Sequence, residues 1–282
     1  MKKIIALLAG LNLISFAVCS NSRFDDVEVT ATQVVGNVFV LTGTGGNIGI
    51  LTGSDGILMV DDQFEPLAHK IEKAIKVASP NSPNKVTYVV NTHYHGDHTG
   101  SNVYFSKSAS ILAHENVRKR MSVKQKGPGL PVITYSDGVK LYVNDDRVHV
   151  KHLSSGHTDG DSVVYFEKHN VWHLGDMLFE SRFPYIDLKS GGSVQGYIQN
   201  LETLLAQIDD TAKVIPGHGN LTDRVGVKNL KDMIVATFAE VSEMKSRGMT
   251  LAQVIEQGLD QKWQAWSWSF INEERWITTL YE

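Results

Sequence analysis

The chain has 282 residues, 42% of them hydrophobic and 21% charged, which is an ordinary balance for a globular protein with an ample core. Its formal net charge is -4 and neither half is strongly basic, which excludes a dedicated nucleic-acid binder, because phosphate contacts need clustered Lys and Arg side chains. One local basic cluster is interpreted as a solvated helix end and loop, with a site for an anionic substrate group as the alternative; it consists of Arg118, Lys119, Arg120, Lys124 and Lys126.

The first residues are typical of an export signal. Lys2 and Lys3 form a positive start, an apolar run covers residues 4–18, and small residues follow near 17–20. We expect residues 1–19 to be a signal peptide, too short and too early for a membrane span, and residues 20–282 to be one periplasmic or otherwise exported domain. Lipid anchoring through Cys19 is the alternative, although Val18 fits a lipobox poorly.

Cys19 is the one cysteine of the chain, so the mature protein would have none. Neither a disulfide nor a thiolate metal ligand is then expected.

The first half of the mature chain predicts strands and then a helix. Apolar β-branched runs between glycine-containing turns predict antiparallel strands in residues 27–35, 38–41, 48–51 and 57–60. Helical spacing of apolar side chains predicts a helix in residues 66–78, and residues 86–90 form an apolar run typical of a strand buried on both faces.

The stretch that follows this buried strand is NTHYHGDHTG, residues 91–100. It places His93, His95, Asp97 and His98 close together on one loop. Imidazole and carboxylate groups are ligands of zinc and similar divalent ions, and they must converge on one point to bind them. The crowding therefore predicts a metal site.

The remainder predicts a second block of strands followed by helices. A short helix near residue 102 and a strand in 111–113 come first, then a helix from 114 or 115. The glycine- and proline-rich residues 122–138 are predicted to be a loop, either a lid or a surface excursion. Strands are expected in residues 140–143, 147–153, 162–166, 171–174 and 213–216, and helices in 194–208, 225–246 and 250–258.

Four of the five tryptophans lie in the last twenty residues. We expect them to pack the tail against the sheet; contact with a substrate or a second subunit is the alternative. They are Trp263, Trp266, Trp268 and Trp276.

Three further polar residues sit on glycine-containing loops just after apolar runs. They are His157 in SSGHTDGD, Asp176 in LGD and His218 in GHG. Strand ends that share one rim of a sheet could bring them to the HYHGDH loop. The other histidines of this region are interpreted as core or surface residues with local hydrogen bonds: His114, His149, His152, His169 and His173.

In order and spacing, these elements resemble the metallo-β-lactamase superfamily, of the HxHxDH type with a bridging aspartate. The resemblance covers nearly all of the mature chain. It implies an α/β fold, the four-layer αββα sandwich, and a site with two metal ions, usually zinc. It also implies the ligands: His93, His95 and His157 for the first ion, Asp97, His98 and His218 for the second, and Asp176 between the two.

The activity implied by the resemblance is that of an exported dinuclear zinc hydrolase, in which a metal-bridging hydroxide cleaves a small ester, lactone, thioester or β-lactam. Asp97 would be catalytic as well as a ligand, because its free oxygen can orient the attacking group or accept its proton. Candidate substrate residues are Arg182, Tyr185 and Lys189, which follow Asp176 closely; an ordinary surface connection is the alternative.

Several alternatives stay open. One β-lactamase subclass uses a cysteine on the second metal, which the mature chain lacks, so we expect a general hydrolase ahead of a true metallo-β-lactamase. A mononuclear iron enzyme of the persulfide dioxygenase type would need only two His and one Asp. A non-catalytic metal-binding protein is the third alternative. We expect a small-molecule substrate, no nucleic acid and no integral membrane span, and the oligomeric state stays open.

Overall fold

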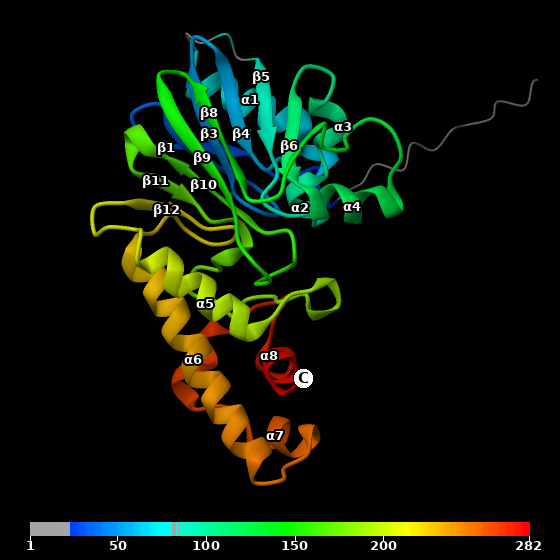
Figure 1. Cartoon of the computed structure of the whole chain (residues 1–282), viewed down its shortest axis with the longest axis vertical. Helices are drawn as coiled ribbons and strands as arrows, with labels where there is room; N and C mark the ends of the chain where they lie inside the picture. Colours follow the sequence, from blue (N-terminus) through cyan, green and yellow to red (C-terminus); the bar gives the residue numbers. More distant parts are fainter. Residues whose placement is uncertain (1–22, 81–82, 84) are drawn as a thin grey trace, which may run out of the picture.

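The computed structural model describes residues 23–80, 83 and 85–282 (Figure 1). The predicted signal peptide, residues 1–19 with Cys19, lies outside this part of the chain. Two sheets pack face to face, and helices cover both outer faces. This arrangement confirms the predicted α/β class and αββα sandwich.

The first sheet has seven strands in the order β1-β2-β3-β4-β5-β6-β7. Strands β1 to β4 form the antiparallel meander that the sequence predicted, and β4 to β7 are parallel neighbours. Their bounds are β1 Thr30–Val35, β2 Val38–Thr42, β3 Ile48–Gly53, β4 Gly56–Val60, β5 Val86–Val90, β6 Ser110–His114 and β7 Ile133–Tyr135.

The second sheet has five strands in the order β12-β11-β10-β9-β8. Its neighbours are antiparallel except for β11 and β12, so β9, β11 and β12 run in the same direction. Their carboxyl ends therefore meet at one edge of the sheet. The bounds are β8 Gly138–Val143, β9 Asp146–His152, β10 Ser162–Phe166, β11 Val171–His173 and β12 Lys213–Ile215.

Three apolar layers separate the sheets and helices. Between the sheets, Val40 and Leu58 of the first sheet pack with Val148 and Val164 of the second. On the outer face of the first sheet, α1 (Ala68–Ala78) follows a short 3-10 helix, η1 (Glu65–Leu67), and buries the apolar residues of its inner face, Ile71 among them, against the strands. The helical spacing predicted for residues 66–78 thus corresponds to a real buried face.

The outer face of the second sheet is covered by α5 (Val194–Leu205) and α6 (Arg224–Ser246). The hydroxyl of Ser193 accepts a hydrogen bond from the Gly196 N–H, which confirms the predicted cap of α5. The last elements are α7 (Leu251–Gln257), η5 (Gln261–Trp266) and α8 (Glu273–Tyr281), and Figure 1 shows them beside α6 on the far side from α1.

Trp276 packs the tail against Phe183 and α6, while packing of the tail tryptophans against the sheet itself stays a prediction. Trp276 is fully buried, its ring stacks on that of Phe183 at 5.7 Å, and its indole N–H donates to the Thr237 hydroxyl on α6. Among the described residues, no helix combines the length and apolar character that crossing a bilayer needs.

The prediction of an irregular loop in residues 122–138 is wrong at both ends. Helix α4 (Glu115–Lys124) continues into this stretch, and β7 forms a parallel edge strand on β6, with Ile133 opposite Leu112. Strand β7 is short and exposed for most of its length, so its conformation comes from pairing with β6. The remaining short helices are α2 (Gly96–Thr99) and α3 (Asn102–Phe105).

Candidate metal centre

The seven predicted ligands all lie at strand ends along the seam between the two sheets. The HYHGDH loop leaves the carboxyl end of β5, and its last residues form the start of α2. His157 lies between β9 and β10, Asp176 in the turn η3 (Gly175–Met177) after β11, and His218 just after β12. The first sheet therefore supplies four of the side chains and the second sheet supplies three.

Two groups of potential ligand atoms result. Each group has its atoms within 4.8 Å of one another, and the groups are His93, His95, His157 and Asp176, and Asp97, His98 and His218. The structure thus brings together all seven side chains and divides them as the resemblance implied.

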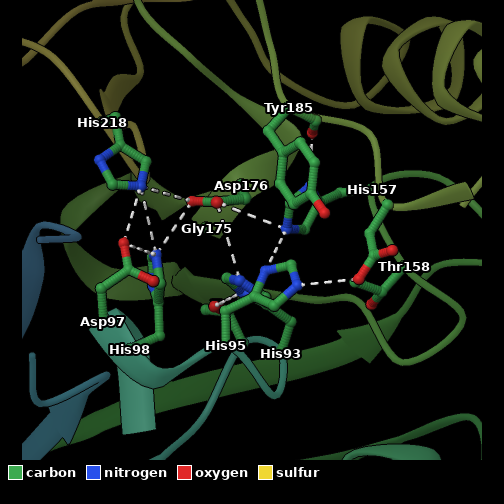
Figure 2. Close-up of polar contacts among 12 residues, drawn as sticks. His93, His95, Asp97, His98, His157, Thr158, Gly175, Asp176, Tyr185 and His218 are labelled. Carbon is green, nitrogen blue, oxygen red and sulfur yellow. Dashed lines mark hydrogen bonds and ion pairs between the residues drawn. The ribbon is translucent and has the colours of Figure 1, made fainter. Parts of the chain in front are cut away.

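Asp176 lies between the two groups and turns one carboxylate oxygen toward each (Figure 2). Its Oδ2 is 3.7 Å from Nε2 of His93 and 3.4 Å from Nε2 of His157. Its Oδ1 is 3.1 Å from Nε2 of His98 and 3.4 Å from Nε2 of His218.

The donor atoms fit metal ions better than they fit each other. Nε2 of His157 faces Nδ1 of His95 at 2.9 Å, and Nε2 of His98 faces Nε2 of His218 at 3.5 Å. Two facing imidazole nitrogens can hydrogen-bond each other only when one is protonated and the other is not, whereas a divalent cation takes the lone pairs of both. Among the described residues, the buried His93 Nε2 and Asp176 Oδ1 also have no hydrogen-bond partner. Each group could therefore hold a divalent ion.

Second contacts fix which ring nitrogen faces the centre. In four of the histidines the other nitrogen has its own partner, which orients the ring and sets its tautomer. The pairs are His93 Nδ1 with Thr92 Oγ1 at 3.1 Å, His95 Nε2 with Asp187 Oδ2 at 3.1 Å, His98 Nδ1 with Asp61 Oδ2 at 2.8 Å, and His157 Nδ1, which donates to the Tyr185 carbonyl at 2.6 Å.

Two of these partners, Asp61 and Asp187, were not singled out from the sequence. Asp61 directly follows β4, takes a left-handed backbone conformation with φ 61°, and also accepts the Thr92 hydroxyl and N–H at 2.7 Å. In the sequence, Asp61 could have been recognised as a candidate because it is a carboxylate directly after a buried apolar strand. Asp187 accepts the Tyr94 hydroxyl as well as His95, and neither partner lies near it in the sequence.

The first group is ready to bind a cation at neutral pH. Burial and the neighbouring imidazoles lower the pKa of His93 well below its ordinary value, and burial lowers the pKa of His157 to about 4. Both rings are therefore neutral. Burial opposes ionisation of Asp176, but the surrounding imidazoles, His98 and His218 first, hold its pKa well below its ordinary value.

The second group is charged instead. Burial opposes protonation of His98, but Asp176, Asp97 and Asp61 outweigh it and hold its pKa well above the ordinary value. Burial also opposes protonation of His218, but Asp176 and Asp97 outweigh it and raise the pKa of His218 to about 9. Burial likewise opposes ionisation of Asp97, but His98 and His218 lower its pKa to about 2. A cation that binds here must displace protons.

A cavity of about 1130 Å³ opens onto this centre. The ligand residues His95, Asp97, Asp176 and His218 line it, so a small molecule can reach both groups. Its other lining residues include several aromatic and several basic side chains.

The structure places two of the three predicted substrate residues at this cavity. Arg182 and Tyr185 line it, and the ring of Tyr185 is 5.6 Å from that of His95. Lys189 is exposed and is not among the lining residues, so its proximity to Asp176 in sequence is not proximity in space. It lies in the turn η4 (Leu188–Ser190), where Asp187 accepts the Ser190 N–H and the chain turns back.

The basic cluster of residues 118–126 also reaches this cavity through Arg120 and Lys124. Arg120 already forms two hydrogen bonds of 2.6 Å to the carboxylate of Asp159. Lys124 is exposed at the cavity rim. The cluster thus lies at the end of α4, as interpreted, and two of its side chains, Arg120 and Lys124, line the cavity.

Comparison with known proteins agrees with the geometry. The sequence matches the family described as the metallo-beta-lactamase superfamily over residues 31–218. Metallo-beta-lactamase type 2 of Bacteroides fragilis is 20% identical over 241 residues, which cover 83% of this chain and 96% of that protein. A hydroxyacylglutathione hydrolase of Nitrosococcus oceani is 25% identical over 167 residues, which cover 58% of this chain and 59% of that protein.

Solved structures show the same fold. A metallo-beta-lactamase from Pontibacter korlensis aligns with a TM-score of 0.64 at 16% identity, over 73% of this chain and 99% of that one. A stereoselective inverting sec-alkylsulfatase from Pseudomonas sp. aligns with a TM-score of 0.70 at 12% identity, over 90% of this chain and 50% of that one.

Proposed function

Since the chain belongs to the metallo-beta-lactamase superfamily and is a metal-dependent hydrolase of that superfamily, we propose that it binds two zinc ions and cleaves a small carbonyl substrate. The substrate class is an ester, lactone or thioester, with a β-lactam as the second choice, because Asp176 stands where one β-lactamase subclass has a cysteine. We also propose that the enzyme is exported, on the composition of residues 1–19.

The observation that carries the proposal of two ions is the position of Asp176. Each of its two oxygens faces a different group of ligand atoms, as expected of a carboxylate between two cations. A mononuclear iron centre in the first group would give no role to Asp97 and His218, which lie 3.4 Å apart in the second group. The dinuclear interpretation accounts for both groups.

When bound, such ions would lower the pKa of a bound water to about 7 and polarise the substrate carbonyl. The protein supplies the rest. His93, His98 and His157 are buried, so their role would be to hold the ions. Asp97 differs from them, because 26% of its side chain is exposed and it lines the cavity. Its ionised carboxylate can accept a hydrogen bond from the attacking water and orient it toward the carbonyl.

Metal content and substrate profile test this function together. Protein purified from the exported fraction without added zinc is expected to hold two zinc ions per chain by elemental analysis, and its intact mass should correspond to an N-terminus near residue 20. It should hydrolyse chromogenic esters, lactones or thioesters faster than cephalosporins. One iron per chain would contradict the dinuclear proposal. Two bound zinc ions without turnover would favour a non-catalytic metal-binding protein.

Zinc binding should also release protons. In the metal-free protein His218, with a pKa of about 9, carries a proton at pH 7 that a bound cation must displace. The apparent zinc affinity of the second group should therefore fall as the pH decreases below 9, by about tenfold per pH unit for each displaced proton. Above pH 9 the dependence on His218 should disappear.

Calorimetry at pH 7, in buffers of different ionisation enthalpy, measures the number of protons released. The variant His218→Ala should release one proton fewer than the wild type. His149→Gln is a suitable control, because His149 lies on β9, bonds Glu167 and is not among the potential ligands. Zinc binding without proton release at pH 7 would refute this account of the second group.

A further inference from the structure

The C-terminal segment contributes part of the cavity wall at the metal centre. Trp268, Ser269 and Phe270 lie between η5 and α8 and line the same cavity as Asp97 and His218. This segment lies outside residues 31–218, over which the family matches. The wall that it forms is therefore an addition to the shared metal centre.

Trp268 is fixed in place by several contacts. Its indole N–H donates to the Phe183 carbonyl at 2.9 Å, and its backbone N–H donates to the Ile271 carbonyl at 3.0 Å. The guanidinium carbon of Arg182 lies 5.1 Å from the ring centroid. The indole ring is thus pre-positioned, and little side-chain entropy remains to be lost when a ligand packs on it.

Neighbouring rings extend this surface across the centre. The ring centroid of Trp268 is 6.0 Å from that of His218 and 5.6 Å from that of Phe270. Phe270 in turn lies 5.4 Å from Tyr185, whose ring is 5.7 Å from that of His157. We call Trp268, Phe270 and Tyr185 the aromatic wall. It reaches from a ligand of the second group to a ligand of the first.

The aromatic wall is accessible and apolar. Phe270 is 45% exposed, although it lies beside other apolar rings, and Trp268 and Tyr185 are half-buried. Apolar side chains gathered at a cavity gain free energy when a ligand removes them from water, and aromatic rings gain further from offset or edge contacts. A planar apolar group is the ligand that would use both effects.

We propose that the aromatic wall binds an aromatic group of the substrate close to the scissile carbonyl, so that the enzyme prefers aryl-substituted acyl groups over small ones. This proposal rests on the hydrolase function proposed above for the reaction, and it adds the substrate class. Binding of the aryl group orients the carbonyl toward both ligand groups, because the wall flanks a ligand of each.

Two thioesters with the same small leaving group, acetyl- and phenylacetyl-N-acetylcysteamine, test the preference. The wild type is expected to have a kcat/KM about tenfold or more higher for the phenylacetyl compound. In Phe270→Ala and Trp268→Ala this advantage should fall by about tenfold, mostly through a higher KM for the phenylacetyl compound, with zinc content unchanged. Phe270 donates no side-chain hydrogen bond, so its variant keeps the test independent of folding.

The matched control is Trp263→Ala. Trp263 belongs to the same C-terminal segment and donates its indole N–H to Glu240, but it is not among the residues that line this cavity. The Trp263→Ala variant should leave the ratio of kcat/KM values for the two thioesters unchanged. Equal rates of the wild type on both thioesters, or an equal loss on both in Phe270→Ala, would overturn the proposal.

A binding measurement separates this proposal from the hydrolase function. Calorimetry of the zinc-loaded protein should show phenylacetate binding about tenfold more tightly than acetate, and Phe270→Ala should remove the difference. The same affinity for both acids would refute the aromatic wall. A clear difference in binding without hydrolysis of either thioester would support the wall and contradict the hydrolase.

Discussion

Replacement of Asp176 by alanine is expected to lower turnover at saturating zinc by about 10³-fold or more. The carboxylate oxygens of Asp176 lie within 3.7 Å of nitrogens from both groups, so its loss removes a ligand from each. It also removes one of the carboxylates that offset the positive charge of His98 and His218. Both metal binding and catalysis should fail together.

Zinc content and thermal unfolding check this result. The wild type should unfold at a higher temperature with zinc than after chelation, because an ion that binds the folded state stabilises it by mass action. This difference should shrink in Asp176→Ala. The control is Asp161→Asn, which also alters a buried carboxylate near the centre. Burial raises the pKa of Asp161 to about 7, so a neutral amide is a close substitute. Two zinc ions and normal turnover in Asp176→Ala would contradict the bridging role.

Replacement of Asp97 by alanine is expected to lower kcat by about 10²–10⁴-fold and to change KM little. Asp97 is both a ligand of the second group, with Oδ2 3.4 Å from His218 Nε2, and the carboxylate at the cavity that can contact the attacking water. Its pKa of about 2 makes it a weak base at neutral pH but a strong hydrogen-bond acceptor. Its main contribution should therefore be orientation.

Asp97→Asn separates these roles. The amide keeps the shape and one ligand oxygen but presents donors where an acceptor is needed, so kcat should remain low even when two zinc ions are bound. Asp159→Asn is the matched control, because its side chain is similarly exposed, at 29%, and bonds Arg120 instead of the ligands. Full activity of Asp97→Ala with normal zinc content would rule the role out.

The sequence predicted the sheets, the main helices and the side chains of the centre because these depend on local pattern. Apolar runs followed by polar loops mark strand ends, and strand ends at a shared edge bring their loops together. Strand β7 was missed because its conformation depends on pairing with β6, which apolar periodicity does not report.

Contacts between distant parts of the chain were the harder part. Asp187 orients His95 from more than ninety positions away, and no spacing along the sequence links the two. The tryptophans of the tail show the same limit. Trp276 packs the tail against α6, whereas Trp268 lines the cavity. The sequence shows both tryptophans in one aromatic cluster. Their different surroundings depend on the turn between η5 and α8, which places Trp268 at the cavity and Trp276 in the core.

The seam between the sheets has a consequence for assembly. The HYHGDH loop belongs to the first sheet, and His157, Asp176 and His218 belong to the second, so neither half of the chain contains a complete set of ligands. An ion at this seam can bind its full set of ligands only when the two halves are correctly docked. Metal binding and the docking of the two halves are therefore thermodynamically linked, so a bound ion should stabilise the folded protein.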